Sequence, residues 1–564
     1  MAESDAVFDP RAACLEALVA GVKPILDCQD TRTGRFGTKP WIATDQNRLL
    51  PLAAAWAIAD PKNPWHHDRR LLNAIMLGGD ALVDDQDPNG MWTFRKKDGS
   101  TWGQIAQPWT YTRWIRAFAL IRDAMPAKRR AKWEKGLRLG YENITKRELR
   151  RVHNIPCHHA MGLACAAQVF GRDDWRRQAK AFMKKVIAEQ HADGWWSEHV
   201  GPVVRYNFVY SESLGCYYAL TGDKAVLPAL RRAAAFHARM VYPDGSLVET
   251  TDERNPYHPG QIHLGNVGLS MTPQGRGFLA RQLRLTLAAG RPINPDWAAQ
   301  MLLYGKTGPA TPTPADRDDD VWTPGDDRIV VLRRKPWFIV ASAYTAPVPT
   351  SRWIQDRQNF VSVFHDKVGL IVGGGNTKMQ PYWSTFTVGD RSLLKHRRGD
   401  ASPRFVPPKG LLHTPSRATA ALVKRKDVVA GVRVALTYGK ERGVVEVFPL
   451  DGKSVRVTYG CTPKGSAPVH GHVTLIPHVG RVIRLNDGDS RKLDGTALDG
   501  VAVGRLEHAG WRLALPYGSR LHWPMKAHNP YRKTGHSTLT EARLVVGLPF
   551  SKAATRYDLT LSVE

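Results

Sequence analysis

Side chains that transfer protons and bind carboxylates gather at two places in this sequence. At the first place, Asn154, His158 and His159 open an Ala-rich segment with helical spacing. At the second, Arg205 and Tyr206 open the next apolar helical segment. Imidazole and phenol groups act as general acids and bases, and amide and guanidinium groups donate hydrogen bonds to anions. The combination predicts acid–base chemistry on an anionic substrate at the starts of two helices.

The elements that must position these groups are helices. Residues 174–189 carry apolar side chains at a spacing near 3.6, which predicts a helix with one buried face. The segments on either side of it, 158–169 and 207–220, are predicted to be inner helices of the same array. Because alternate helices of such an array run in the same direction, we expect Asn154 and Tyr206 to fall at the same mouth.

Tyr206 is the first candidate for moving protons. Arg205 directly precedes it. A nearby guanidinium and the positive end of a helix both stabilise the phenolate, so they lower the pKa of a tyrosine below its ordinary value near 10. The alternative is that Tyr206 only packs against the helix or caps it. Tyr210 lies one turn later on the same face and is the second candidate. Of His158 and His159, one is expected to be a buried, hydrogen-bonded core residue.

Glu198 and several tryptophans are candidates for contacts around the substrate. Glu198 is expected to orient an arginine or a histidine rather than to react itself. Tryptophans beside arginines can stack on a flat sugar face or fill the core, and both possibilities stay open for Trp109, Trp195 and Trp196.

A third polar loop, residues 243–263, is expected to line the cleft or to bind only its own turn. It contains Asp252, Arg254, Asn255, Tyr257, His258 and His263, of which Arg254 and His263 are the predicted substrate contacts. Its histidines lack a recognised metal-ligand spacing, so no metal or other cofactor is predicted.

The composition favours a polyanionic partner. The 564 residues carry 80 Lys and Arg against 52 Asp and Glu, a formal charge of +28. A balance so far from zero suits an acidic polymer, and a generally basic surface is the alternative. No nucleic-acid-binding motif is recognisable, so nucleic acid is not the expected partner. No apolar run reaches the roughly 18 residues of a membrane span.

The N-terminal residues do not read as a signal peptide, and the six cysteines form no CxxC pair. We therefore expect no structural zinc site, and we expect buried free thiols at Cys157 and Cys165.

The spacing of apolar residues changes along the chain. Residues 1–305 predict paired helices wound in a ring, with three long Asp-Gly or Asn-Gly loops at one mouth. Residues 306–328, rich in Pro, Thr and Asp, predict a linker. Residues 329–564 form many short alternating runs, typical of an antiparallel β-sandwich. The predicted fold is an incomplete (α/α) toroid followed by this sandwich. Helices are expected at residues 11–26, 47–59, 68–83, 111–124, 131–141, 158–169, 174–189, 207–220, 225–241 and 275–289.

A helical ring followed by an antiparallel sandwich resembles the toroid-type polysaccharide lyases, above all the heparinase II/III-like and alginate-lyase group. The group's Asn and His opening an Ala-rich helix are similar to NIPCHHAMGLACAAQVFG, from Asn154. Its Asp-Gly, Glu and Tyr at a helix start are similar to DGWWSEHVGPVVRY, from Asp193 to Tyr206. Its later Pro-Asp-Gly with an acidic turn is similar to PDGSLVETTD, from Pro243. Together these motifs cover roughly residues 150–375 in order.

The chain departs from this group in two ways. The spacing from Glu to Tyr is longer here. Members of the group often carry a His-rich start of a sandwich strand, where this sequence has Gln355, Asp356, Gln358 and Asn359, with His365 only later. A catalytic histidine from the sandwich is therefore in doubt.

The resemblance implies a periplasmic or secreted polysaccharide lyase that cleaves a uronic-acid polymer by metal-independent β-elimination. Asn154 would polarise the carboxylate, and Arg205 would bind the anion and lower the pKa of the tyrosine. Tyr206 would move protons. His159 would act as the base on substrates of the opposite C5 configuration, or orient the carboxylate.

Two other functions stay open at this point. A glycoside hydrolase on a helical toroid needs two carboxylates about 5–10 Å apart, with Asp193, Glu198 and Asp252 as candidates. The other is a protein that binds acidic glycans without catalysis. The sequence does not choose among uronate polymers, between endo and exo cutting, or between oligomeric states.

Overall fold

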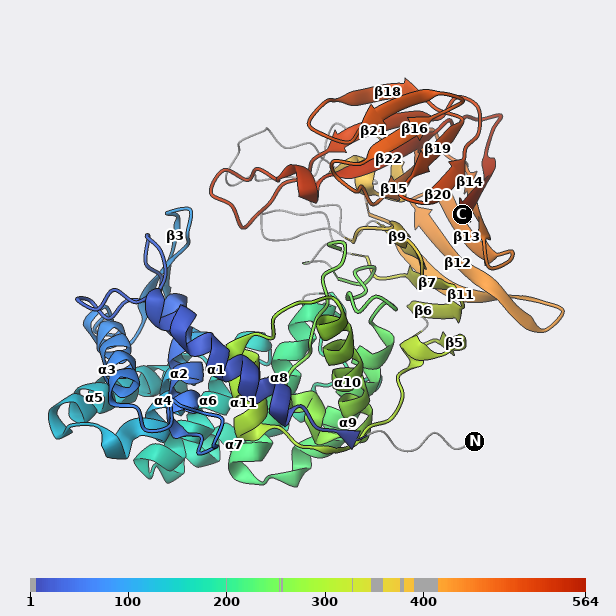
Figure 1. Ribbon diagram of the computed structural model, residues 1–564. Helices are drawn as coiled ribbons and strands as arrows, with labels where there is room; N and C mark the ends of the chain where they lie inside the picture. The colour runs from blue at the N-terminus through green and yellow to red at the C-terminus, as the bar shows by residue number, and fades with distance from the viewer. Residues whose placement is uncertain are drawn as a thin grey trace. The chain divides into compact units, whose positions relative to one another are not determined.

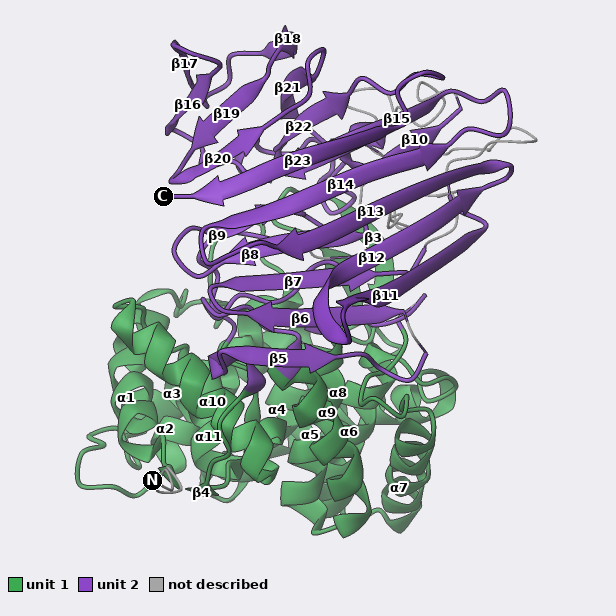
Figure 2. Ribbon diagram, turned by 90° about the vertical axis from the view of Figure 1, so that its right-hand side faces the viewer, with its two compact units in different colours: residues 1–197, 206–238, 264–313 green, residues 198–205, 239–263, 314–564 purple. Residues whose placement is uncertain are grey.

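The structure, a computed structural model, describes residues 7–198, 200–252, 254, 257–326, 328–345, 359–375, 380–389 and 414–564. The chain divides into two compact units, coloured in Figure 2. Unit 1 comprises residues 1–197, 206–238 and 264–313, and unit 2 comprises residues 198–205, 239–263 and 314–564. Helices come first along the chain and strands later (Figure 1).

Unit 1 is an array of α-helices. Helix α4 packs along α2 and α6, and α6 packs along α7. Helix starts use side-chain caps, as when the Asp68 carboxylate accepts a hydrogen bond of 2.7 Å from the Leu71 amide at the start of α3. The strands described in this unit are two ribbons, β1 (Val7–Phe8) with β4 (Gly308–Pro309) and β2 (Trp92–Arg95) with β3 (Thr101–Ile105). The helices are α1 Arg11–Asp27, α2 Leu49–Ala57, α3 Arg69–Asp84, α4 Pro108–Ile121, α5 Ala127–Arg147, α6 Asn154–Phe170, α7 Asp173–Ala188, α8 Val204–Thr221, α9 Leu227–Arg239, α10 Pro273–Ala288 and α11 Pro295–Tyr304.

The ten predicted helices are all present, with shifted ends, and α11 is an additional one. Helix α11 has a start signal in the sequence. The Asn294 side chain accepts a hydrogen bond of 2.8 Å from the Asp296 amide, and Pro295 occupies the first helical position. An Asn cap followed by Pro is a typical helix start, so this helix could have been predicted.

Unit 2 is dominated by two antiparallel sheets, which within the described residues have ten and nine strands. The first follows the order β18-β21-β22-β15-β9-β8-β7-β6-β5, with β10 also paired to β15. The second follows the order β11-β12-β13-β14-β23-β20-β19-β16-β17. The strands of the first are β5 Asp319–Trp322, β6 Ile329–Arg334, β7 Trp337–Ser342, β8 Val361–His365, β9 Gly369–Val372, β10 Phe386–Val388, β15 Val469–Leu475, β18 Leu498–Ala502, β21 Arg520–Met525 and β22 Arg543–Leu548. Those of the second are β11 Arg417–Arg425, β12 Val428–Tyr438, β13 Glu441–Pro449, β14 Ser454–Thr462, β16 Val482–Leu485, β17 Asp489–Lys492, β19 Arg505–His508, β20 Trp511–Ala514 and β23 Arg556–Val563.

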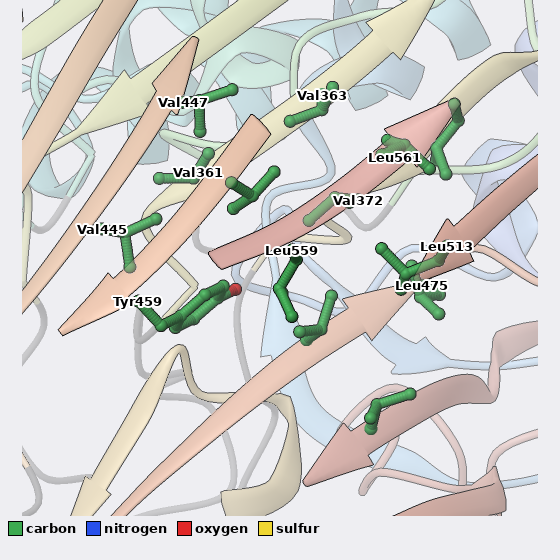
Figure 3. Packing of buried hydrophobic residues seen from close by; sticks show 14 of the residues in the cluster. Val361, Val363, Val372, Val445, Val447, Tyr459, Leu475, Leu513, Leu559 and Leu561 are labelled. Atoms are coloured by element: carbon green, nitrogen blue, oxygen red, sulfur yellow. The ribbon is translucent and has the colours of Figure 1, made fainter. Parts of the chain in front are cut away.

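The two sheets pack face to face through aliphatic side chains (Figure 3). Val361 and Val363 of β8 belong to the same buried cluster as Val445 and Val447 of β13. Alternate residues of each strand point into this core, as the period of two predicts. The expected fold class, a helical toroid followed by an antiparallel β-sandwich, is therefore confirmed.

The cysteines of the chain are all free, and Cys157 and Cys165 are buried as expected. Among the helices that the structure describes, none is both long enough and apolar enough to cross a membrane.

Candidate active site

Asn154 is the first residue of helix α6. His153, just before it, has an extended backbone with φ of −160°, which ends the preceding loop and lets the helix begin. Only 8% of Asn154 is exposed. The first turn of a helix carries backbone N–H groups without helical partners and a partial positive charge. The Asn154 carboxamide therefore lies where the backbone favours an anion.

Tyr206 lies in the first turn of helix α8 and is half-buried. The side chain of its neighbour Asn207 accepts a hydrogen bond of 2.6 Å from the Trp196 amide. It also donates one of 3.1 Å to the Trp196 carbonyl. These two bonds tie the start of α8 to the preceding loop, so Tyr206 sits on a well-anchored helix end and is still partly exposed.

The other aromatic candidates, Trp195 and Trp196 of the loop and Tyr210 of α8, are buried in stacked pairs. The Trp196 ring lies nearly parallel to Tyr210, with 4.8 Å between centroids, and its indole N–H donates to the Val186 carbonyl at 2.7 Å. Trp195 stacks on His191 at 4.3 Å. In this arrangement the three rings support the loop. Sugar stacking by the tryptophans and proton transfer by Tyr210 stay predictions.

His158 is fully buried beside the half-exposed Trp109, with 5.8 Å between ring centroids. Its Nε2 lies 3.5 Å from a carboxylate oxygen of Glu212, and its Nδ1 lies 3.2 Å from the Thr112 hydroxyl. Burial lowers the pKa of His158, so the ring is neutral. A neutral ring facing a carboxylate keeps its proton on Nε2. Nδ1 then lies against the Thr112 hydroxyl, which also donates to the Pro108 carbonyl at 2.9 Å. His158 therefore has the character expected of a hydrogen-bonded core histidine.

Glu212 is a site residue that the sequence reasoning missed. It lies in the middle of the apolar helix α8, and 15% of its side chain is exposed. Burial disfavours its ionised form, but the N–H of His158 and the charges of Arg113 and Arg116 outweigh burial and lower the pKa of Glu212 to about 2. A glutamate inside an apolar helical segment was the available signal, because a buried carboxylate requires a donor or a cation.

Two arginines of α4 complete this interior network. Arg113 donates two hydrogen bonds to the Asp296 carboxylate, at 2.8 and 2.6 Å. Arg116 is fully buried and donates to the Thr112 carbonyl at 2.9 Å and to the Gln300 side chain at 3.0 Å. Helices α4, α6, α8 and α11 thus all contribute polar side chains to one network inside unit 1.

His159 is fully buried as well. Burial lowers its pKa to about 3, so the ring is neutral at physiological pH. A neutral imidazole has the protonation state of a base, and in this structure the His159 side chain is enclosed. Its role as a base stays a prediction.

In unit 2, the Asp252 carboxylate organises the residues predicted to bind an anion. It accepts a long hydrogen bond of 3.5 Å from the Arg205 amide and one of 2.7 Å from the Arg254 amide. The Arg254 guanidinium donates to the Tyr531 hydroxyl at 3.1 Å, in the loop between β21 and β22. The Arg205 side chain is exposed. Asp252 therefore fixes the backbone of both arginines through their amide groups.

A pocket of unit 2 is lined by Arg205, Ser246, Leu247, Val248, Glu249, Asp252, Tyr257, His258, Gln261 and His263. Burial and the charge of Arg205 lower the pKa of His263 to about 3, so this imidazole stays neutral. The pocket combines the Arg205 guanidinium, which can bind a carboxylate or a sulfate through two parallel hydrogen bonds, with the carboxyl groups of Asp252 and Glu249.

A second buried carboxylate, Glu249, anchors this pocket to the sandwich within unit 2. It accepts hydrogen bonds from the Ser362 hydroxyl at 2.6 Å, the Tyr242 hydroxyl at 2.9 Å and the Gly374 amide at 3.1 Å. These donors are neutral, and burial raises the pKa of Glu249. Because Ser362 lies on β8, the loop that carries the pocket is fastened to a sheet.

The predicted site residues are divided between the units. Glu198 is 6% exposed, and its amide donates to the Gly201 carbonyl at 3.0 Å. Unit 1 contains Trp109, Asn154, His158, His159, Trp195, Trp196, Tyr206 and Tyr210, and unit 2 contains Glu198, Arg205, Arg254 and His263. Their convergence in one cleft stays a prediction.

The sandwich segment with Gln355, Asp356 and Gln358 lies outside the described residues. Asn359, which is described, is 6% exposed, and the later His365 lies on β8. Within the ranges that the structure describes, no group of three His, Cys, Asp or Glu side chains is arranged to hold a metal ion.

No protein-family model and no curated protein matches this sequence. The fold, however, is similar to solved polysaccharide lyases. Paenibacillus xanthan lyase matches with a TM-score of 0.58 and 11% identity, over 98% of this chain and 57% of that one. Heparinase III matches with a TM-score of 0.55 and 13% identity, over 94% of this chain and 79% of that one.

Chondroitin AC lyase of Streptomyces coelicolor A3, solved in complex with chondroitin sulphate, matches with a TM-score of 0.53 and 12% identity, over 100% of this chain and 80% of that one. The chain thus spans little more than half of the xanthan lyase chain. At these identities the likeness concerns the fold, which is the toroid and sandwich of the polysaccharide lyases.

Proposed function

We propose that this protein is a polysaccharide lyase that cleaves a uronic-acid polymer by β-elimination. The observation that carries the proposal is the extent of the fold likeness. The three lyases match 98%, 94% and 100% of the chain, so the helical and sandwich parts are both included. The local chemistry of the predicted residues agrees with this reaction.

The reaction has three tasks. A base removes the proton from C5 of the uronate, and the electron pair of that bond forms the C4–C5 double bond. The bond between C4 and the leaving oxygen breaks, and an acid protonates this oxygen. As the proton leaves C5, negative charge builds up on the neighbouring carboxylate, so hydrogen-bond donors at that carboxylate lower the barrier.

Side chains of this protein suffice for these tasks. Asn154, in the first turn of α6, donates to the carboxylate, and the exposed Arg205 binds the anion. Tyr206, half-exposed in the first turn of α8, moves protons between C5 and the leaving oxygen. His159 serves as the base on substrates of the opposite C5 configuration. The route needs no metal or other cofactor.

His158 and Glu212 act on this site indirectly. The ionised Glu212 holds the neutral His158 beside Trp109. His158 follows Asn154 by one turn of helix α6. The contact between His158 and Glu212 keeps the first part of α6 and the middle of α8 in a constant relation inside unit 1. We therefore assign His158 and Glu212 to positioning.

In this proposal the polymer is acidic because the protein is strongly basic. A net charge of +28 attracts a polyanion and favours its encounter with the enzyme. A polymer of this kind is met outside the cytoplasm, so a periplasmic or secreted location fits the proposed activity.

Ultraviolet absorbance tests the proposal directly. β-Elimination leaves a C4–C5 unsaturated uronate, which absorbs, whereas hydrolysis and binding leave none. The protein should raise the absorbance with at least one of alginate, glucuronan, hyaluronan and heparan-type chains. New reducing ends without absorbance would replace the proposal with a glycoside hydrolase. Binding without new ends would replace it with a glycan-binding protein.

A further inference from the structure

Unit 2 has a second basic surface, on the outer face of the nine-stranded sheet. Side chains of a strand alternate between the two faces of its sheet. Val432 and Val434 of β12 belong to the core, so Arg433 and Ala435 face outward. Figure 2 shows β11, β12, β13 and β14 side by side, and the same alternation holds along each of them.

The register of the strands arranges the outward residues in rows that cross the sheet. The first row is Arg417, Thr437, Arg442 and Thr462, the second is Thr419, Ala435, Val444 and Gly460, and the third is Ala421, Arg433, Glu446 and Thr458. The second row has small side chains, and the rows on either side of it carry the arginines. The middle row is therefore the floor of a channel between two taller rows.

This channel is a groove of about 260 Å³, lined by Arg417, Thr419, Arg433, Ala435, Leu436, Thr437, Arg442, Gly443 and Val444. Arg417 and Arg442 lie two strands apart on one wall, a separation of roughly 10 Å from the usual strand spacing. Arg433 lies on the opposite wall. An extended chain along the groove would pass all three guanidinium groups.

The positive charge of the groove is largely uncompensated. Arg417 and Arg442 are exposed, and neither has a carboxylate partner in the part of the chain that the structure describes. Arg433 is 51% exposed and lies 3.7 Å from Glu446. Guanidinium forks bind carboxylates and sulfates, and the threonines of the same rows offer hydroxyl groups to sugars. The chemistry of the groove matches an acidic glycan.

We propose that the groove formed by Arg417, Arg433 and Arg442 is a second binding site for acidic polysaccharide, distinct from the pocket that Arg205 lines. The choice of polymer rests on the proposed function. A single nucleic-acid strand is disfavoured because the three rows contain no aromatic side chain on which bases could stack. A second copy of this chain is disfavoured because it would bring like charges together.

A second site changes catalysis in a specific way. A long chain held in the groove keeps its other residues near the enzyme, which raises their effective concentration. An oligosaccharide too short to use the groove gains nothing. The groove should therefore matter for long polymers and not for short ones.

The test compares two triple variants with equal loss of charge. One removes the groove arginines by Arg417→Gln, Arg433→Gln and Arg442→Gln. The control removes three exposed charges of the β16–β17 hairpin in the same sheet, by Arg484→Gln, Arg491→Gln and Lys492→Gln. Binding of alginate, hyaluronan and heparin is measured by affinity electrophoresis in a Tyr206→Phe background. With Tyr206 intact, kcat/KM is measured on long chains and on tetrasaccharides.

Exposed ion pairs contribute roughly a factor of two to five each, so the groove triple should bind the polymer about tenfold or more weakly. Its kcat/KM should fall on long chains and stay unchanged on tetrasaccharides, and the control should change less than twofold. Equal losses in both triples, or tighter binding of DNA than of any glycan, would overturn the inference.

The same data separate this inference from the proposed function. Cleavage of a polymer with normal binding by the groove triple would reject the groove and keep the lyase. Groove-dependent binding together with no cleavage of any of the polymers would reject the lyase and keep the groove.

Discussion

Each unit contains a buried glutamate, and their pKa values shift in opposite directions. Around Glu212 in unit 1, the charges of Arg113 and Arg116 and the N–H of His158 outweigh burial and lower the pKa to about 2. Around Glu249 in unit 2, the donors are hydroxyl and amide groups, and burial raises the pKa. Both carboxyl groups are shielded from water. The Arg543 guanidinium also interacts electrostatically with Glu249, but there burial is the larger effect, whereas at Glu212 two arginines and the His158 N–H outweigh burial.

The contrast reflects the two architectures. In unit 1, four helices direct long polar side chains inward, so anions and cations meet inside the array. In unit 2, strands sort their side chains by face, so the space between the sheets is aliphatic and the arginines of β11, β12 and β13 remain outside. The helical array therefore encloses a network of anions and cations, while the sandwich buries some arginines, such as Arg333 and Arg543, and presents those of β11, β12 and β13 on its outer face.

Replacing Glu212 with Gln should have the largest effect and would test the charged interior of unit 1. The folded pKa near 2 lies below the ordinary value of 4.5. The ionised carboxylate therefore stabilises the fold above the unfolded pKa, and this contribution is lost as the pH falls toward 2.

Thermal unfolding across pH measures this difference. Glu212→Gln should be less stable than the wild type at neutral pH and should converge with it near pH 2. A difference that is constant across pH would show that the cations do not set the state of Glu212.

Replacing Tyr206 with Phe should reduce turnover at least about a hundredfold, because it removes the proton-carrying oxygen and keeps the ring. Substrate binding should change little. Tyr210→Phe is the matched control, since it makes the same chemical change one turn later, where the ring is buried against Trp196. Steady-state kinetics on the cleaved polymer measure both.

The reverse pattern, an active Tyr206→Phe and an inactive Tyr210→Phe, would move the assignment by one helical turn. If both variants and Asn154→Ala remain active, the elimination mechanism placed on unit 1 is wrong.

Replacing Glu249 with Gln should produce a smaller effect with the opposite dependence on pH. The pKa of Glu249 is higher in the folded than in the unfolded protein, so the unfolded state loses this proton first as the pH rises. The stability of the wild type therefore falls as the pH rises through the folded pKa. The Gln variant lacks this loss and should gain stability relative to the wild type as the pH rises. Chemical unfolding at several pH values checks the sign, and parallel curves would contradict the contrast between the two glutamates.

Replacing Arg254 with Gln should have the smallest effect, a rise in KM of roughly two- to fivefold with little change in kcat, as expected for a partly exposed charged group that binds the anion. Tyr531→Phe is the control, since it removes the hydroxyl that accepts the Arg254 hydrogen bond and leaves the guanidinium in place. A larger loss in kcat than in KM would place Arg254 in the chemistry instead of in binding.

Local patterns explain how much of the fold could be predicted. The helical period anticipated α6 and α8, and their true starts at Asn154 and Val204 lie within a few residues of the expected ones. Helix α11 was missed because it is short and its apolar pattern is weak, although Asn294 and Pro295 mark its start. The alternating runs after residue 329 correctly predicted antiparallel strands, but not their order in two sheets.

The candidate site was predicted less completely. The residues at helix starts, Asn154 and Tyr206, could be found because a helix start is a local feature of sequence. Glu212 and Arg113 were not assigned to the site. The apolar surroundings of Glu212 in α8 were a signal that it is buried, but the packing of the helices decides which partners it meets. The groove arginines have ordinary positions on exposed strand faces, and only the register of three strands aligns them.

By itself, the sequence determined the change from helices to strands, the presence of the helices that carry Asn154 and Tyr206 with starts correct to within a few residues, and the strong positive charge, since periodicity and composition are local or additive properties. Only the tertiary structure decided which side chains meet. Thr112 and His158 are 46 residues apart, and Arg113 and Asp296 are 183 residues apart, yet each pair is in hydrogen-bond contact. Contacts at such separations depend on the packing of whole helices, and so does the protonation state of the groups they enclose.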